Sequence, residues 1–370
     1  MSSPPLRLGI VGCGFATQSR HLPALARIRE AEVVALADLD ADLLARVADR
    51  WRVARRHRDT QALIADPLVE AVAICTPAAD HVPLALAAIA AGRHVFVEKP
   101  LALSLAEADR LVAAAAASAS RVMVGFNLRW HRLALAAREL VAGGAIGRVR
   151  AVRSVFGDPL LARSAVPAWR LRRTAGGGSI LDKAIHHFDL WRYLLADEVE
   201  WVTAASASAA GDDEIATMTA RTARGTLLTA WSADVTTIAN EMTLDGESGS
   251  LHLDFYRFDG LERRAPGALP GAPATRLRRL AAALGALGGN AGELLRGGAF
   301  DTAYDRQWRH FAAIVRGDLA PGCGLDDGRA ALAIALAALR AAETGDRCAV
   351  PPPPAAPGRA GARGEDERAR

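Results

Sequence analysis

The chain has 370 residues, 51% hydrophobic and 23% charged, so it can bury a large core and is long enough for two domains. Its net charge of +4 comes from dispersed arginines with only 5% aromatic residues, which argues against nucleic-acid binding. The apolar runs are too short for a signal core or a membrane span, and the four cysteines lack metal-binding spacing. We therefore expect a cytoplasmic protein with reduced thiols, no metal site and no membrane partner.

The first predicted element is a strand over Leu6 to Val11, followed by a turn over Gly12 to Thr17 and a helix from His21. In a dinucleotide-binding fold, the first glycine permits the tight turn and the second lets the backbone approach the pyrophosphate at the helix N-terminus. Thr17 stands where a third glycine is expected, so the fingerprint is incomplete. The candidate cofactor contacts in this turn are Gly12, Gly14, Phe15 and Ala16.

A second predicted strand, Glu32 to Ala37, delivers Asp38. An acid at this strand end accepts hydrogen bonds from ribose hydroxyls and repels a 2′-phosphate, which favours NAD, with NADP possible. The alternative is that Asp38 caps the helix predicted over Asp40 to Arg50.

Strands and helices continue to alternate up to residue 125, which predicts a parallel sheet covered on both faces and a Rossmann domain over residues 1–126. The remaining strands of this domain are predicted over Val69–Cys75, His94–Val97 and Arg121–Gly125, and the helices over Ala79–Ala91 and Ser104–Ala117. Ligands bind beyond the carboxyl ends of such strands, where Thr76, Pro77, Glu98 and Lys99 follow. His81, a few residues on, has the alternative of being a surface helix residue.

Lysine is rare in this chain. Only Lys99 and Lys183 occur among 45 Lys and Arg residues. Arginine stays protonated, whereas burial and neighbours can tune a lysine for acid/base chemistry. Both lysines are therefore candidate functional residues.

Lys183 lies in the stretch from Gly176 to Leu195, where three glycines precede a predicted amphipathic helix. At 3.6 residues per turn, a polar stripe forms on one side and an apolar stripe on the other. The polar stripe consists of Asp182, His186, Asp189 and Tyr193, and the apolar stripe of Ile180, Ala184, Trp191, Leu194 and Leu195. The alternative is an ordinary solvated helix face. We hypothesise that Lys99 meets Asp182 and His186 across a cleft, and that His187 points to the packed side.

The second half changes to strand runs separated by polar turns, which predicts an antiparallel sheet in a domain over residues 127–350. The strands are predicted over Val149–Phe156, Glu200–Ser208, Ile215–Arg221, Thr226–Trp231, Asn240–Leu244 and Ser250–Phe258. The Gly176 helix is expected against this sheet, facing the first domain. Residues 263–298 have helical tendency and are interpreted as a lid, an oligomer contact or a mobile insertion. The tail over residues 351–370 is predicted to be disordered.

Several motifs resemble the glucose–fructose oxidoreductase / inositol dehydrogenase (Gfo/Idh/MocA) family. The first-half motifs are GIVGCG, CTPAADH, AGRHVFVEKPLA and VGFNLRW. The resemblance implies a Rossmann NAD(P)-binding domain followed by a domain with a large, mainly antiparallel open sheet. It places Lys99 beside the nicotinamide and the substrate, and it assigns Thr76, Pro77, His81 and Glu98 to the cofactor. It also makes Asn127 and Arg129 candidate substrate contacts.

The resemblance extends from residue 6 to residue 350, apart from the 263–298 stretch. Its second-half motifs are Trp169-Arg170, assigned to the cofactor, the glycine run, and Asp182 with His186. The chain departs from the family at Ala184, usually glycine, and at Lys183, usually small or apolar. Lys183 is interpreted either as a contact to an anionic or hydroxylated substrate or as the partner of a nearby acid at the surface.

These features predict reversible oxidation of a secondary alcohol on a sugar, cyclitol or related polyol. His186 is the expected acid/base, Asp182 orients the imidazole or the substrate, and Lys99 stabilises the developing alkoxide. The alternatives are an NAD-dependent glycosidase that works by oxidation and elimination, and a non-catalytic dinucleotide or sugar sensor. The expected assembly is a homodimer or homotetramer formed through the second sheet.

Overall fold

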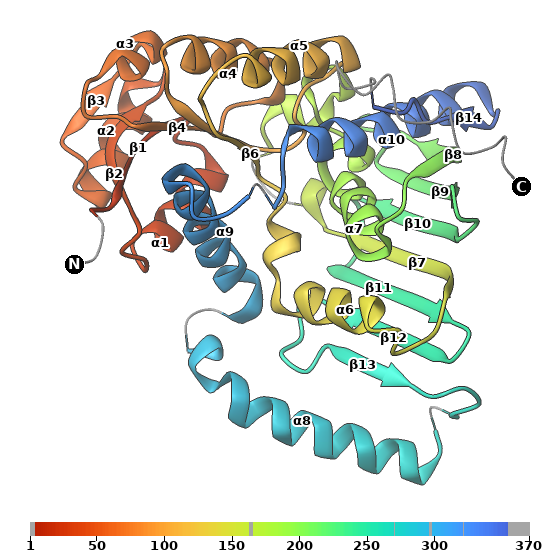
Figure 1. The fold of residues 1–370 in the computed structure, drawn as a ribbon. Helices are drawn as coiled ribbons and strands as arrows, with labels where there is room; N and C mark the ends of the chain where they lie inside the picture. Colours follow the sequence, from red (N-terminus) through yellow and green to blue (C-terminus); the bar gives the residue numbers. More distant parts are fainter. Residues whose placement is uncertain (1–3, 163–165, 270, 296–297, 321, 354–370) are drawn as a thin grey trace, which may run out of the picture.

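The computed structural model describes residues 4–162, 166–269, 271–295, 298–320 and 322–353. It contains a parallel sheet built by the first third of the chain and a larger, mainly antiparallel sheet built mostly by residues 149–264 (Figure 1). The predicted fold class is therefore confirmed. Most element boundaries differ from the predicted ones by only a few residues.

Within the described residues, the first sheet has six parallel strands in the order β3-β2-β1-β4-β5-β6. The strands are β1 (Leu6–Val11), β2 (Ala31–Ala37), β3 (Arg55–His57), β4 (Ala71–Ile74), β5 (His94–Val97) and β6 (Val122–Val124). The helices of this domain are α1 (Leu22–Leu25), α2 (Ala41–Trp51), α3 (Thr60–Ala65), α4 (His81–Ala90) and α5 (Leu105–Ala116). The strand order reverses between β1 and β4, and the carboxyl ends at such a reversal form the crevice where ligands bind.

The second sheet follows the order β13-β12-β11-β7-β10-β9-β8-β14. Its strands are β7 (Val149–Gly157), β8 (Val199–Ala207), β9 (Ile215–Thr222), β10 (Leu227–Ala233), β11 (Ala239–Gly246), β12 (Gly249–Asp254), β13 (Leu261–Arg264) and β14 (Cys348–Ala349). Neighbours pair antiparallel except β7 and β10, which are parallel, so the sheet is mixed. The strand predicted over Ser250–Phe258 ends earlier, at Asp254.

Helices cover one face of the second sheet. They are α6 (Arg132–Ala142), α7 (Ile185–Leu195) and α10 (Leu325–Thr344) (Figure 1). Strand β9 alternates buried and exposed residues, as expected when only one face is covered. The predicted position of α7, against the sheet and toward the first domain, is confirmed.

The closing part of the chain returns to the first sheet. Helix α9 (Gly298–Arg316) buries Trp308 and Phe311 against Phe96 of β5, with ring centroids 4.4 and 5.9 Å away. Arg27 adds an ion pair with Asp305 of α9 at 2.7 Å. Residues of α9, far along the chain, thus contribute to the core of the N-terminal domain.

The stretch expected to be helical contains α8 (Pro273–Leu294), which runs along the edge of the molecule beyond β13 (Figure 1). Leu277, Leu280 and Leu284 of α8 are exposed. The tail prediction concerns residues 351–370, of which 354–370 lie outside the described residues. No helix in the described ranges is long and apolar enough to cross a membrane.

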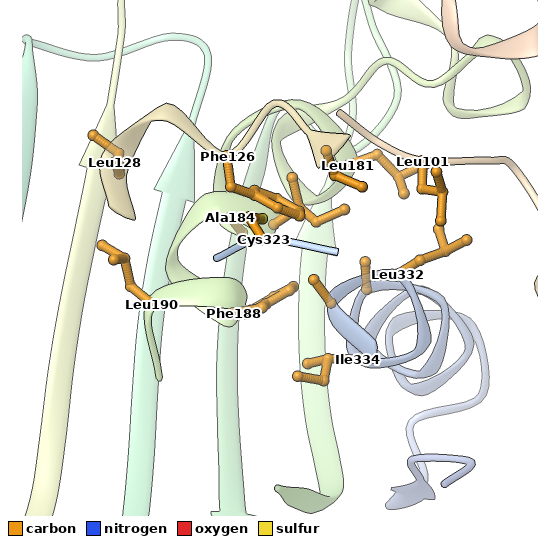
Figure 2. Packing of buried hydrophobic residues seen from close by; sticks show 14 of the residues in the cluster. Leu101, Phe126, Leu128, Leu181, Ala184, Phe188, Leu190, Cys323, Leu332 and Ile334 are labelled. Carbon is orange, nitrogen blue, oxygen red and sulfur yellow. The ribbon is translucent and has the colours of Figure 1, made fainter. Parts of the chain in front are cut away.

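A shared apolar core joins the two sheets. Figure 2 shows side chains from the loops after β5 and β6, from the Gly176 stretch and from α10 packed together. The labelled members are Leu101, Phe126, Leu128, Leu181, Ala184, Phe188, Leu190, Cys323, Leu332 and Ile334. Leu101 lies two residues after Lys99, and Leu181 directly precedes Asp182. The packing of the two leucines therefore fixes the positions of Lys99 and Asp182 relative to each other.

Candidate active site

The turn after β1 has the geometry of a dinucleotide-binding loop. Gly12 has φ +93°, and a Cβ there would lie 2.6 Å from the backbone oxygen of Cys75, so only glycine fits. A Cβ at Gly14 would meet nothing within 4 Å, which leaves open space beside the backbone. The Thr17 hydroxyl donates to the Gly12 oxygen at 2.5 Å, so Thr17 braces the turn from the position of the third glycine. Phe15 is exposed, and Ala16 leads into a π-helical turn over Thr17–His21.

Asp38 lies beside this loop at the end of β2. Its carboxylate accepts hydrogen bonds from the backbone N–H groups of Cys13 at 2.7 Å and Asp40 at 2.9 Å. Helix α2 is capped by Asp40, whose carboxylate accepts from the N–H groups of Asp42 and Leu43. The alternative that Asp38 is the helix cap is therefore wrong. A carboxylate held at this position is suited to accept hydrogen bonds from a ribose.

His81 is not a surface helix residue, as its alternative interpretation had it. The side chain is buried, with Nδ1 2.8 Å from the Pro100 oxygen and Nε2 3.0 Å from the Thr76 oxygen. Burial lowers the pKa of His81 and favours the neutral ring, whose single N–H donates to one of these two carbonyl oxygens at a time. His81 therefore lies between the segments that follow β4 and β5. The Thr76 hydroxyl itself is buried and has no partner among the described residues, as expected of a group that awaits a ligand.

Lys99 contacts the second domain directly. Its Nζ donates to the Asp182 carboxylate at 2.7 Å and to the Asp182 backbone oxygen at 2.6 Å. Arg170 pairs with the other carboxylate oxygen of Asp182. Burial raises the pKa of Asp182, but the charges of Lys99 and Arg170 outweigh burial and hold that pKa well below 3.8. The expected contact of Lys99 with Asp182 is therefore confirmed, whereas no hydrogen bond or ion pair among the described residues joins Lys99 to His186.

Asp182 belongs to a π-helical turn, Ile180–Ala184, that leads into α7. The whole stretch from Gly176 to Trp191 is buried, so the alternative of a solvated helix face is wrong. Trp169 is half-buried beside Arg170, whose guanidinium carbon lies 5.8 Å from the centroid of the indole ring. Arg170, expected at the cofactor, thus holds Asp182.

His186 lies one turn after Asp182, between the rings of Phe126 and Phe156 at centroid distances of 6.0 and 6.1 Å. Its Nδ1 is buried without a partner among the described residues. Burial and the nearby charge of Lys99 hold the pKa of His186 well below 6.5, so the ring is neutral. No hydrogen bond among the described residues joins His186 to Asp182, which orients Lys99 instead.

Two neighbours of this centre are paired internally. The Lys183 amine forms an ion pair with the Asp234 carboxylate, and both side chains are buried. The expected acidic partner thus exists, but it lies in the interior and not at the surface. Burial lowers the pKa of Lys183 to about 8. The Nε2 atom of His187 lies 2.9 Å from Asn240 Oδ1 on the packed side, as predicted, and burial lowers its pKa to about 4.

Arg129 does not point toward an open site. It donates to both carboxylate oxygens of Asp189, at 2.7 and 2.6 Å, and to the Gly322 oxygen at 2.9 Å. The guanidinium is buried and also lies over Tyr193, so we assign Arg129 and the second half of the polar stripe to structural support. By contrast, the buried Asn127 amide nitrogen has no partner among the described residues.

Sequence reasoning missed Asp234, Asn240 and His21. Asp234, directly after β10, and Asn240, in β11, contact the Gly176 stretch from far along the chain, so no local pattern marks them. His21 was assigned only to a helix start, although it contacts Glu98, the expected cofactor residue before Lys99. The one available signal was an imidazole just after the glycine loop.

Comparison with known proteins identifies the two domains. Residues 6–126 match the family model "Oxidoreductase family, NAD-binding Rossmann fold", and residues 134–252 match the GFO/IDH/MocA C-terminal domain. The chain is 35% identical over 210 residues to the myo-inositol 2-dehydrogenase of Thermotoga maritima, a match that covers 57% of this chain and 60% of that protein. It is 30% identical over 258 residues to Oxidoreductase P35 of Formosa agariphila, which covers 67% of this chain and 79% of that protein.

Among solved structures, GenD2 from gentamicin A biosynthesis, in complex with NAD, is similar with a TM-score of 0.78 and 25% identity. That match covers 94% of this chain and 97% of the other. The glycine loop, the Asp38 carboxylate and the free Thr76 hydroxyl fit the same cofactor. The chain belongs to the Gfo/Idh/MocA family of oxidoreductases, and its first domain is an NAD-binding Rossmann domain.

Proposed function

We propose that this protein catalyses the reversible oxidation of a secondary alcohol on a sugar, cyclitol or related polyol, with NAD as cofactor. The observation that carries the proposal is the contact of Lys99 with Asp182, which joins the strand end beside the cofactor loop to the buried helix that bears His186. Relatives named myo-inositol 2-dehydrogenase and 1,5-anhydro-D-fructose reductase support this substrate class.

Each residue of the candidate site has its own role in the reaction. Bound NAD supplies the hydride acceptor. Lys99 donates a hydrogen bond to the reacting oxygen and stabilises the charge that develops there, while Asp182 and Arg170 fix its position. His186 is neutral and takes the hydroxyl proton. Asn127 offers its free amide to a further substrate hydroxyl.

The charges at this centre bear on whether the substrate is a neutral polyol or an acid sugar. Lys183 is paired with Asp234, but the Asp182 carboxylate is shared by Lys99 and Arg170, so this centre keeps one positive charge in excess. An excess positive charge stabilises the alkoxide that develops on the reacting oxygen. The charge count admits both neutral polyols and acid sugars, and the names of the relatives favour a neutral polyol.

The expected homodimer or homotetramer is kept as part of the proposal. The face of the second sheet opposite α6, α7 and α10 is available for it, because exposed residues alternate along β9 on that side. Analytical ultracentrifugation measures the assembly directly. A monomer at all concentrations would contradict this part of the proposal.

A substrate screen tests the activity. Purified protein is incubated with NAD or NADP and a panel of sugars, cyclitols and acid sugars, and with the reduced cofactors and the keto forms. The absorbance of the reduced nicotinamide is followed, with Lys99→Met as the control. We expect turnover with NAD and an uncharged polyol that the control lacks. Tight NAD binding without turnover of any compound would contradict the dehydrogenase and favour the sensor.

A further inference from the structure

A buried ion pair lies directly behind Lys99. His21 ends the π-helical turn after the glycine loop, and its side chain is completely buried. Its Nε2 lies 3.0 Å from Glu98 Oε1, and the other oxygen of Glu98 accepts the backbone N–H of Lys99 at 3.1 Å. Two contacts therefore connect the π-helical turn Thr17–His21 to the backbone of Lys99, the residue that pairs with Asp182.

The protein makes room for this pair and shields it. A Cβ at Gly125 would lie 2.9 Å from Glu98 Oε1, so the glycine leaves space for the carboxylate. Aromatic rings of Phe96, Tyr304 and Trp308 surround the imidazole edge-on, with centroids 5.5 to 5.6 Å away. A carboxylate in such apolar surroundings is costly unless it is paired.

The charges of the two groups support each other. Burial lowers the pKa of His21, but Cys75 and Glu98 outweigh burial and raise it to about 10. Burial raises the pKa of Glu98, but His21 and Lys99 bring it below 4.5. His21 is thus an imidazolium and Glu98 a carboxylate at neutral pH.

We propose that His21 is a positioning residue for Lys99: its imidazolium holds the Glu98 carboxylate against the Lys99 backbone N–H and so fixes the point from which the lysine reaches Asp182. The catalytic part of this inference rests on the proposed function. The structural link from His21 to Lys99 does not, because it can be measured without turnover.

The scarcity of lysine provides a direct probe. Protein labelled with ¹³C at lysine Cε has signals only from Lys99 and Lys183, and Lys183→Arg assigns them. His21→Gln removes the imidazolium and is expected to shift or broaden the Lys99 signal while the Lys183 signal stays in place. His57→Gln is the matched control, since His57 Nε2 lies 3.2 Å from Asp66 in another histidine–carboxylate pair of the same domain. It should leave both signals unchanged.

Kinetics supply the second measurement. His21→Gln should lower kcat by about 10- to 100-fold, the cost of a small misplacement of a reacting group, with KM for NAD within about threefold. In a Lys99→Met background the same change should cause no further loss, because it acts through Lys99. An unchanged Lys99 signal in folded His21→Gln, or equal disturbance of both lysine signals, would overturn the proposal. If His21→Gln does not fold, Glu98→Gln tests the same link and must move only the Lys99 signal.

Discussion

Two histidines near Lys99 are buried to a similar degree, yet their pKa values move in opposite directions. His21, in the first domain, has its pKa raised to about 10, whereas the pKa of His186, in the second domain, lies well below 6.5. Burial lowers the pKa of both, so the neighbours make the difference. His21 lies against the Glu98 carboxylate, whereas the positive charge of Lys99 lowers the pKa of His186, which has no hydrogen bond to a carboxylate among the described residues.

The comparison separates two uses of the same side chain. A charged imidazole paired with a carboxylate holds structure in place, and a neutral imidazole that has no carboxylate paired with it can accept a proton. The sequence suggested His186 because an unperturbed histidine titrates near neutrality. In the structure neither histidine titrates near neutrality, and the electrostatic partner of each indicates its role.

The largest expected effect follows removal of the neutral histidine. His186→Gln should lower kcat by about 10²- to 10⁴-fold, the usual cost of losing a positioned acid or base. Affinity for NAD, measured by fluorescence, should stay within a few-fold. His187→Gln serves as the control, because His187 pairs with Asn240 and should act through stability alone. A near-normal rate in His186→Gln would remove it from the mechanism.

Neutral histidines should make the protein sensitive to acid. The pKa of His187 is about 4 when folded and 6.5 in the unfolded reference, so the unfolded state binds more protons below pH 6.5. Its contribution to stability is present above pH 6.5 and is lost at about 1.4 kcal/mol per pH unit as the pH falls toward 4. Urea unfolding at several pH values should show a shallower loss in His187→Gln. Equal slopes in the two proteins would mean that His187 is not held neutral.

The contribution of His21 to stability should depend on pH in the opposite direction. Its folded pKa of about 10 exceeds the unfolded value of 6.5, so its contribution is complete below pH 6.5 and is lost as the pH rises toward 10. His21→Gln should therefore lose less stability than the wild type between about pH 7 and about pH 9. Urea unfolding measures the difference, and a steeper alkaline loss in the variant would contradict an imidazolium at this position.

A smaller effect tests how the charge of Lys99 influences the pKa of His186. Lys99→Met removes the positive charge that helps to lower the pKa of His186, so this pKa should rise while remaining below 6.5 because burial persists. Titration of the ring by NMR detects the change, and Lys183→Met should produce a smaller one. A decrease in the pKa would contradict the electrostatic account.

Local patterns predicted much of the fold and part of the site. Alternating strands and helices indicated the parallel sheet, and the rarity of lysine indicated Lys99. Long-range pairing was not predictable. Asp182 and Asp189 look equivalent in the sequence, because both belong to the same polar stripe. In the structure Asp182 forms an ion pair with Lys99, whereas Asp189 forms one with Arg129. The packing of α9 on β5 could not be predicted from local patterns either, because it joins residues about 200 positions apart.

The most direct test of the central claim is to replace each lysine by arginine and to measure hydride transfer and NAD binding in parallel. Lys99→Arg keeps the charge but enlarges the head group beside Asp182, so turnover should fall by orders of magnitude with NAD affinity within a few-fold. Lys183→Arg should retain more activity, because Lys183 is ion-paired with Asp234 and has no assigned role at the reacting oxygen. Near-normal turnover in Lys99→Arg would contradict the assignment of Lys99 to the reacting centre.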